Sequence, residues 1–293
     1  MTTFIQQLIN GLMLGSVYAL LALGYTMVYG IIKLINFAHG DIYMLGAYFG
    51  YFFIKVLHLN FFIALILAMA VSAIIGVVIE YIAYRPLRHS PRIAVLISAL
   101  GISFLLENGM TYLYGSDQRS FPQAIKTVQY HFYGIQVSNI QLIIAVTSIV
   151  LMLLLTYIVK NTKMGRAMRA VSADPDAALL MGININHTIS FTFAIGSALA
   201  AAGGILIGLY YNSIDPLMGM TPGLKAFVAA VLGGIGIIPG AAAVGGWLIG
   251  ILETMVQATA FSDYKDAIVY AMLIVILLIK PTGILGKNKR EKV

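Results

Sequence analysis

Long runs of hydrophobic residues, separated by short polar segments, dominate the chain. No Asp, Glu, Lys or Arg occurs in residues 1–32, 127–159, 177–214 or 226–252. A helix needs about 20 mostly apolar residues to cross the hydrocarbon layer, and lipid-exposed backbone must pair its amides within the segment. The pattern therefore predicts an all-α, polytopic transmembrane helix bundle, with residues 1–293 forming a single transmembrane domain.

Composition supports this prediction. Hydrophobic residues make up 60% of the chain and charged residues 10%, and the mean hydropathy is +0.92, values that a soluble globule does not reach. The chain has no cysteine, which excludes disulfides, thiolate metal sites and thiol catalysis. A cleaved signal peptide begins with basic residues, whereas no Lys or Arg precedes Lys33, so we expect the first apolar segment to be a retained helix.

The net charge of +7 comes from loops and does not indicate a nucleic-acid-binding patch. The basic groups are Arg85, Arg88 and Arg92; Lys160, Lys163, Arg166 and Arg169; and Lys280, Lys287, Lys289, Arg290 and Lys292. The positive-inside rule predicts that all three groups face the cytoplasm. The N-terminus is then expected outside and the C-terminus in the cytoplasm.

This orientation constrains the number of spanning segments, because an outside start and an inside loop at Arg85 require an odd number of crossings between them. The predicted spans are 5–32, 41–57, 61–84, 93–113, 141–159, 188–211, 224–238, 241–258 and 267–279. Residues 224–238 are short and glycine-rich, so they either cross the membrane or re-enter it. The count is therefore eight or nine.

The two halves of the chain show a weak similarity. Leu14-Gly-Ser in the first span is echoed by Ile195-Gly-Ser in the sixth, and each span precedes an interrupted apolar segment containing Leu-Gly. The predicted topology would orient these halves oppositely, as in transporters built from inverted repeats with discontinuous helices. Similar glycine-rich composition explains the pattern equally well, so the sequence leaves the repeat open.

Polar residues within apolar segments are candidates for a transport pathway, because a charge near the bilayer centre costs several kcal/mol unless it faces protein or water. The candidate pathway residues are Asn36, His39, Asp41, Glu107, Lys225 and Glu253. Asp41 and Lys225 each begin an interrupted segment, where they could bracket a polar cavity or cap a helix. We expect Glu80 to pair or be hydrated at the cytoplasmic boundary. The small residues of 198–204 and 240–250 are expected to allow close helix packing.

Enzyme motifs are missing from the sequence. It contains no phosphate-binding G-x-x-x-x-G-K-[ST] loop, no G-x-S-x-G elbow and no histidines at metal-binding spacing. We therefore predict no catalytic residues, no metal site and no cofactor bound by this chain.

A different signal lies in the predicted cytoplasmic loop 160–187. Asp174-Pro175-Asp176 is typical of a helix start, with proline in the first turn and acids near the positive end of the helix dipole. Residues 177–181 favour helix, and Gly182 is expected to end it. A cytoplasmic loop with its own capped helix requires a surface on which to dock.

Residues 176–182 resemble the E-A-A-x-x-x-G cytoplasmic motif of bacterial ATP-binding-cassette (ABC) importer permeases, with Asp in place of Glu. Further similarity extends over nearly the whole chain and is closest to the shorter, LivH-type permease of branched-chain amino acid importers. The matching stretches are N-F-A-H-G-D from Asn36, G-R-A-M-R-A from Gly165, D-P-D-A-A-L-L-M-G-I-N from Asp174, G-L-K-A-F-V-A-A-V-L-G-G-I-G from Gly223, I-P-G-A from Ile238, Y-K-D from Tyr264 and K-P-T-G-I-L-G from Lys280.

The resemblance implies a permease subunit in the bacterial cytoplasmic (inner) membrane. Its expected partners are a second permease, two ATPase subunits that carry ATP and Mg²⁺, and an extracytoplasmic substrate-binding protein. The expected substrates are leucine, isoleucine and valine; permeases of this subfamily also serve urea, amides and other amino acids. The residues expected at the ATPase interface are Arg166, Arg169, Asp174, Pro175, Asp176, Ala177 and Gly182. An ion-coupled secondary transporter is the alternative from another class.

Overall fold

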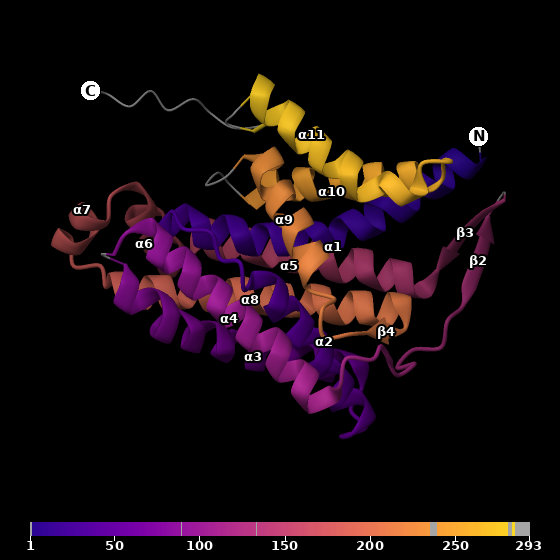
Figure 1. Ribbon diagram of the computed structural model, residues 1–293, viewed down its shortest axis with the longest axis horizontal. Helices are drawn as coiled ribbons and strands as arrows, with labels where there is room; N and C mark the ends of the chain where they lie inside the picture. The colour runs from indigo at the N-terminus through magenta and orange to yellow at the C-terminus, as the bar shows by residue number, and fades with distance from the viewer. Residues whose placement is uncertain (1, 89, 133, 235–238, 281–282, 285–293) are drawn as a thin grey trace.

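Every predicted span is helical over most of its length in the computed structural model (Figure 1), which describes residues 2–88, 90–132, 134–234, 239–280 and 283–284. The α-helices are α1 (Thr2–Ile32), α2 (His39–Lys55), α3 (Phe61–Ile79), α4 (Arg92–Tyr114), α5 (Asn139–Asn161), α6 (Lys163–Ala173), α7 (Pro175–Leu180), α8 (Ile185–Tyr211), α9 (Met220–Gly233), α10 (Pro239–Gln257) and α11 (Lys265–Ile279). A π-helical turn (Glu80–Tyr84) and a 3₁₀ turn (Arg85–Leu87) follow α3, and a second 3₁₀ turn (Ser262–Tyr264) precedes α11.

Five helical segments are long and apolar enough to cross a membrane: Thr2–Ile32, Phe61–Leu87, Arg92–Tyr114, Asn139–Asn161 and Ile185–Tyr211. Two shorter apolar helices are Met220–Gly233 and Ala242–Gln257. These elements confirm the all-α polytopic class. With 14 residues, α9 is about 21 Å long, shorter than the roughly 30 Å hydrocarbon layer, as expected for an interrupted segment. The last residues of the predicted span 224–238 lie outside the described residues.

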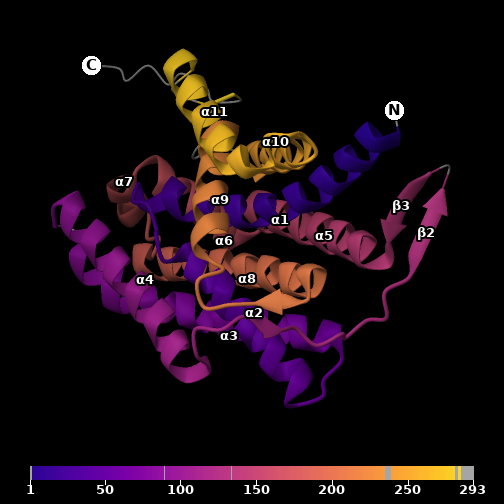
Figure 2. The same cartoon turned by 45° about the vertical axis from the view of Figure 1, so that its right-hand side comes forward.

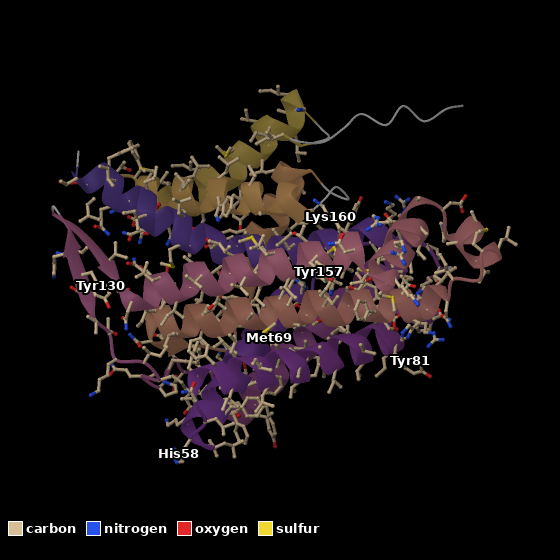
Figure 3. The ribbon with its side chains drawn as sticks, turned by 180° about the vertical axis from the view of Figure 1, so that it is seen from behind. His58, Met69, Tyr81, Tyr130, Tyr157 and Lys160 are labelled. Atoms are coloured by element: carbon tan, nitrogen blue, oxygen red, sulfur yellow. The ribbon has the colours of Figure 1, made fainter. Side chains whose placement is uncertain are left out.

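The two ends of the bundle carry different loops. Tyr81 and Lys160 lie toward the end that carries α7, whereas His58 and Tyr130 lie at the opposite end (Figure 3). The basic segments around Arg85 and Lys160 therefore share one end, as predicted. Which end faces the cytoplasm stays a prediction. The predicted basic tail 287–292 lies outside the described residues.

Two helices form the centre of the bundle. In the most apolar stretch of α1, 89% of the residues are buried, and in α8 83% are, compared with 33% for the segment beginning with α3, 28% for α5 and 17% for α4. The inner helices are rich in Ala and Gly, so they can be surrounded by neighbours, whereas α3, α4 and α5 keep a wide apolar surface for lipid or for another protein. The buried share of each helix therefore distinguishes central from peripheral helices, which hydropathy does not do because both kinds are apolar.

The packing of the two halves is consistent with an inverted repeat. Helix α1 packs along α10 and α8 packs along α3, while α2 contacts α8 and α9 contacts α1. If α1, α2 and α3 correspond to α8, α9 and α10, the α1–α10 contact becomes the α8–α3 contact, and the α2–α8 contact becomes the α9–α1 contact. Helices α1 and α8 run in opposite directions (Figures 1 and 2). The helix pairings provide the support that sequence similarity alone lacks.

Small residues bring the paired helices together. Gly11 and Gly15 on α1 face Gly246 and Gly250 on α10, and a Cβ added to Gly15 would lie 2.9 Å from the Gly246 oxygen. This is a small-xxx-small contact on both helices, and it confirms the predicted close packing at Gly246 and Gly250.

Short strands in the loops were missed by the sequence analysis. Strand β2 (Gln129–Phe132) pairs with β3 (Ile135–Ser138) as an antiparallel hairpin that projects from the bundle (Figure 2). Strand β1 (Arg119–Ser120) pairs with β4 (Ser213–Ile214). The Gln6 and Gln136 residues exchange two hydrogen bonds of 2.8 Å between the Gln6 side chain and the Gln136 backbone. Such two- to four-residue strands depend on long-range partners, so local patterns do not predict them.

We expect Gly46→Ala to destabilise the chain, because the new Cβ would lie 2.6 Å from the Ala201 Cβ, where α2 meets α8. Overpacking of this kind costs about 1–3 kcal/mol. Gly109→Ala is the matched control, since no atom lies within 4 Å of its added Cβ and alanine favours helix by roughly 0.5–1 kcal/mol. Thermal unfolding of the purified chain in detergent measures both, and equal unfolding temperatures would contradict the packing assignment.

Candidate coupling segment and buried polar clusters

The predicted cytoplasmic loop contains two helices, α6 and α7, rather than the single one expected. Helix α6 begins at a Thr162 cap whose hydroxyl accepts from the Gly165 amide at 3.0 Å, and it buries Gly165, Met168 and Val171 on one face. The sequence analysis interpreted residues 163–173 as a basic loop, because only three of these residues form the buried face of the helix. The spacing of the buried residues, three apart, is the helical signal that sequence reasoning missed.

Helix α7 is built as the sequence predicted. The Asp174 carboxylate caps it by accepting from the Ala177 amide at 2.9 Å, and Pro175 occupies the first turn. Gly182 ends it with φ +80°, a conformation that favours glycine. The Gly182 and Ile183 amides donate to the Leu179 and Ala178 carbonyls, the two hydrogen bonds of a Schellman motif.

The segment is attached to the centre of the bundle. The Ser172 hydroxyl donates to the Gly30 carbonyl of α1 at 2.6 Å. The Arg169 guanidinium donates to the Val159 carbonyl at the end of α5, and a Cβ added to Gly165 would collide with the Ile158 and Val159 oxygens. A displacement of α7 would therefore be transmitted through α6 to α1 and α5.

The predicted interface residues divide into two groups. Arg169, Asp174, Pro175 and Gly182 shape the segment through the contacts given above. Arg166, Asp176 and Ala177 are exposed. The main apolar surface was not among the predicted residues: Leu180 is 88% exposed and Met181 82%, next to exposed Leu179. The large apolar residues at 179–181, at the end of a helix that a charged segment begins, are the sequence signal that identifies this surface.

Two candidate pathway residues, Lys225 and Glu253, form one buried ionic cluster. The Lys225 Nζ lies 2.7 Å from Glu253 Oε1 and 2.6 Å from Asp266 Oδ1. The Tyr18 hydroxyl donates to Glu253 Oε2 at 2.8 Å, and Lys265 Nζ lies 3.7 Å from Glu253 Oε1. The cluster joins α1, α9, α10 and α11 and balances two positive charges with two negative ones. Tyr18 and Asp266 were missed, because nothing local links either of them to Lys225.

The remaining candidates lie near the break between α1 and α2. Asn36 accepts from the Tyr84 hydroxyl at 2.9 Å, and His39 Nε2 lies 3.2 Å from the Leu21 carbonyl. Asp41 accepts from the Ser103 hydroxyl of α4 at 2.5 Å. Glu107 lies on α4 as well, one helical turn beyond Ser103.

The structure does not bring Asp41 and Lys225 together. Asp41 contacts α4, whereas Lys225 contacts α10 and α11. Their helices do meet nearby, since a Cβ added to Gly223 would lie 2.9 Å from the Gly40 Cα. The expectation that Asp41 and Lys225 bracket one cavity is not supported by their contacts. The Asp41 carboxylate is bonded to Ser103 of α4, and the Lys225 ammonium is paired with Glu253 of α10 and Asp266 of α11.

Glu80 forms a further cluster at the α7 end of the bundle. Its carboxylate, fully buried, pairs with Arg88 and accepts from the Ser190 hydroxyl at 2.7 Å. Arg88 also donates to the Asn186 side chain at 2.6 Å. The expected ion pair at this boundary is present, with Arg88 as the partner. The cluster ties the α3–α4 connection to the start of α8.

A small cavity lies between α1 and α9. Its lining residues are Tyr25, Thr26, Tyr29, Ile35, Phe227 and Ala230, and its volume of about 10 Å³ is close to the smallest that admits one water molecule. No group of three or more His, Cys, Asp or Glu side chains that could hold a metal occurs within the described part of the chain.

Comparison with known proteins assigns the chain to one family. Residues 7–277 match the model described as "Branched-chain amino acid transport system / permease component". The chain is 43% identical to the high-affinity branched-chain amino acid transport system permease protein LivH of Escherichia coli (strain K12), covering 99% of this chain and 98% of the relative. The BraD permease protein of Pseudomonas aeruginosa is also 43% identical with the same coverage, and a probable LivH permease protein of Methanocaldococcus jannaschii is 30% identical over 93% of this chain and 89% of its own.

Proposed function

The chain belongs to the family of permease components of branched-chain amino acid transport systems, and on this premise we propose that it is the membrane-spanning subunit of an ABC importer for leucine, isoleucine and valine. It works in the bacterial cytoplasmic membrane, with the N-terminus outside and the α7 end in the cytoplasm. The observation that carries the proposal is α7, whose exposed apolar residues form a docking surface on an otherwise basic end of the bundle.

One of the importer's two ATPase subunits binds α7 from the cytoplasm in this proposal. Both ATPase subunits hold ATP and Mg²⁺, and this chain binds no cofactor and catalyses no reaction. Leu180 and Met181 fill a groove on an ATPase, while Arg166 and Asp176 contact its polar rim. The segment 160–187 is thus the coupling loop of the single permease domain.

Movement of α7 changes the helix bundle through named contacts. When the ATPases close on ATP, α7 carries α6 with it, and Ser172 transmits the displacement to α1 through the Gly30 carbonyl. The Glu80–Arg88 cluster couples the start of α8 to the α3–α4 connection. Since α1 and α8 are the central helices, their displacement switches the pathway between outward-open and inward-open arrangements.

A pathway lined by apolar side chains suits the apolar side chains of leucine, isoleucine and valine. The cavity between α1 and α9 is lined by aromatic and aliphatic side chains, of which Tyr25, Thr26 and Tyr29 carry hydroxyl groups. We propose that the pathway follows this side of α1, with a second permease subunit completing it and an extracytoplasmic binding protein delivering the amino acid. Candidate contacts along the pathway are Asn36, His39, Asp41, Glu107, Lys225 and Glu253.

The proposal predicts that the affinity-tagged chain, produced with its neighbouring genes, copurifies with ATPase subunits and a second permease. Proteoliposomes of that complex, supplied with binding protein, should take up labelled leucine only with internal ATP. Urea and a short amide test the alternative substrates in the same vesicles. Accumulation of leucine by this chain alone, driven by an ion gradient, would overturn the proposal in favour of a secondary transporter.

A further inference from the structure

Two cations lie on a pair of neighbouring tyrosine rings where α2 and α4 end. Lys55, the last residue of α2, donates from Nζ to the Tyr51 hydroxyl at 2.8 Å, and its Nζ lies 4.9 Å from the centre of the Tyr51 ring. The Arg119 Cζ lies 5.3 Å from the centre of the Tyr114 ring. The Tyr51 and Tyr114 rings meet edge to face, with their centres 6.5 Å apart. We call these four residues the tyrosine–cation cluster.

The tyrosine–cation cluster carries two positive charges that no carboxylate balances. None of the ion pairs within the described residues includes Lys55 or Arg119. Arg119 donates from Nε and Nη2 to the carbonyl of Tyr114, the last residue of α4, so part of its guanidinium completes a helix end. Lys55 uses one of its three donors on the Tyr51 hydroxyl. Helix capping thus explains one edge of Arg119, but it explains neither the Lys55 ammonium nor the missing counter-ion.

The tyrosine–cation cluster lies at a helix end where lipid headgroups are expected. His58, three residues after Lys55, lies at the end of the bundle opposite α7 (Figure 3). Tyrosine and basic side chains are typical of the layer where the hydrocarbon meets water. Apolar side chains beside the cluster face outward: Tyr112 is 90% exposed and Leu113 70%, and Phe52 on α2 is also exposed. The site therefore combines unbalanced positive charge with an apolar surface that continues into the membrane.

We propose that the tyrosine–cation cluster binds the phosphate group of an anionic phospholipid. Phosphate oxygens accept charge-assisted hydrogen bonds from ammonium and guanidinium groups, and the net negative charge of the lipid supplies the missing counter-charge. The acyl chains lie along Tyr112 and Leu113. A free phosphate ion would satisfy the cations but would leave this apolar surface unused. The site requires only that the chain spans a membrane, so it does not depend on the transported substrate.

Native mass spectrometry of the full-length chain in detergent, titrated with phosphatidylglycerol, tests the site. The double variant Lys55→Gln with Arg119→Gln should bind this lipid at least tenfold more weakly, because each cation near anionic headgroups strengthens binding by about fivefold. Lys126→Gln is the matched control, since Lys126 is an exposed cation of the same loop as Arg119 but lies outside the cluster. Its affinity should change by less than about twofold. Equal losses in the double variant and the control, or no loss in the double variant, would overturn the proposal.

Two further titrations identify the source of the phosphate. Phosphatidylcholine with the same acyl chains is neutral overall and should bind at least about fivefold more weakly than phosphatidylglycerol, the effect of one uncompensated charge. Equal affinity would show that the cluster does not recognise an anionic lipid. Inorganic phosphate at the same concentration should not displace phosphatidylglycerol. Displacement would assign the cluster to a free phosphate ion instead.

Single substitutions at Lys55 separate binding from folding. Lys55 is exposed, so Lys55→Gln should leave the unfolding temperature unchanged and weaken phosphatidylglycerol binding by about fivefold. Lys55→Arg should retain binding, because it keeps the charge. This pair decides the question even if the double variant does not fold. An unchanged affinity with Lys55→Gln, or an equal loss with Lys55→Arg, would contradict a site that recognises the lipid by charge.

Discussion

Replacing Leu180 and Met181 together by serine is expected to abolish ATP-driven leucine uptake without unfolding the chain. Both side chains are more than four-fifths exposed, so their truncation should change the free energy of unfolding by less than about 0.5 kcal/mol. Buried apolar anchors at protein interfaces contribute about 2–4 kcal/mol each, and each 1.4 kcal/mol is a tenfold change in affinity. ATPase binding should therefore fall by at least tenfold.

Copurified ATPase per permease and leucine uptake in proteoliposomes measure this loss. Leu217→Ser is the matched control, because Leu217 is also an exposed leucine (59%) but lies in the loop before α9, away from the α7 end. It should retain the ATPases. Normal ATPase binding by the double serine variant, with a normal unfolding temperature, would show that α7 is not the docking helix.

Lys225→Met is expected to be among the most destabilising single substitutions in the chain. It removes the ammonium that lies 2.7 Å from Glu253 and 2.6 Å from Asp266. The Glu253 carboxylate would then remain buried, with Tyr18 and the more distant Lys265 as its remaining partners. Breaking a buried ion pair by removing one member costs about 3–5 kcal/mol, so the unfolding temperature in detergent should fall clearly.

Lys265→Met is the control for this prediction. Its ammonium is 3.7 Å from Glu253 and its side chain is 36% exposed, so solvent screens the interaction and the loss should stay below about 1 kcal/mol. The double variant Lys225→Met with Glu253→Gln should recover part of the stability, because it no longer leaves the Glu253 charge unpaired. Equal unfolding temperatures for the two single variants would mean that Lys225 is not the centre of the cluster.

The candidate site was predictable to different degrees at its two locations. The α7 segment follows from local chemistry: Asp174 caps, Pro175 starts and Gly182 ends a helix through contacts no more than five residues apart. Lys225 and Glu253 were identifiable as costly charges in apolar segments, but their pairing was not, because Tyr18 and Asp266 reach them from helices distant in sequence.

The sequence by itself determined the membrane class, the approximate position of each spanning helix and the capped helix at Asp174, since these depend on composition and on neighbours within a few residues; it did not determine α6. Only the tertiary structure decided that α1 and α8 are central, that α1 packs along α10 as α8 packs along α3, and that Lys225 joins four helices. The physical reason is that hydropathy measures how much surface avoids water, whereas lipid and protein interior are equally apolar. Which surface meets protein is then decided by small residues and hydrogen-bonding groups, whose partners come from other helices.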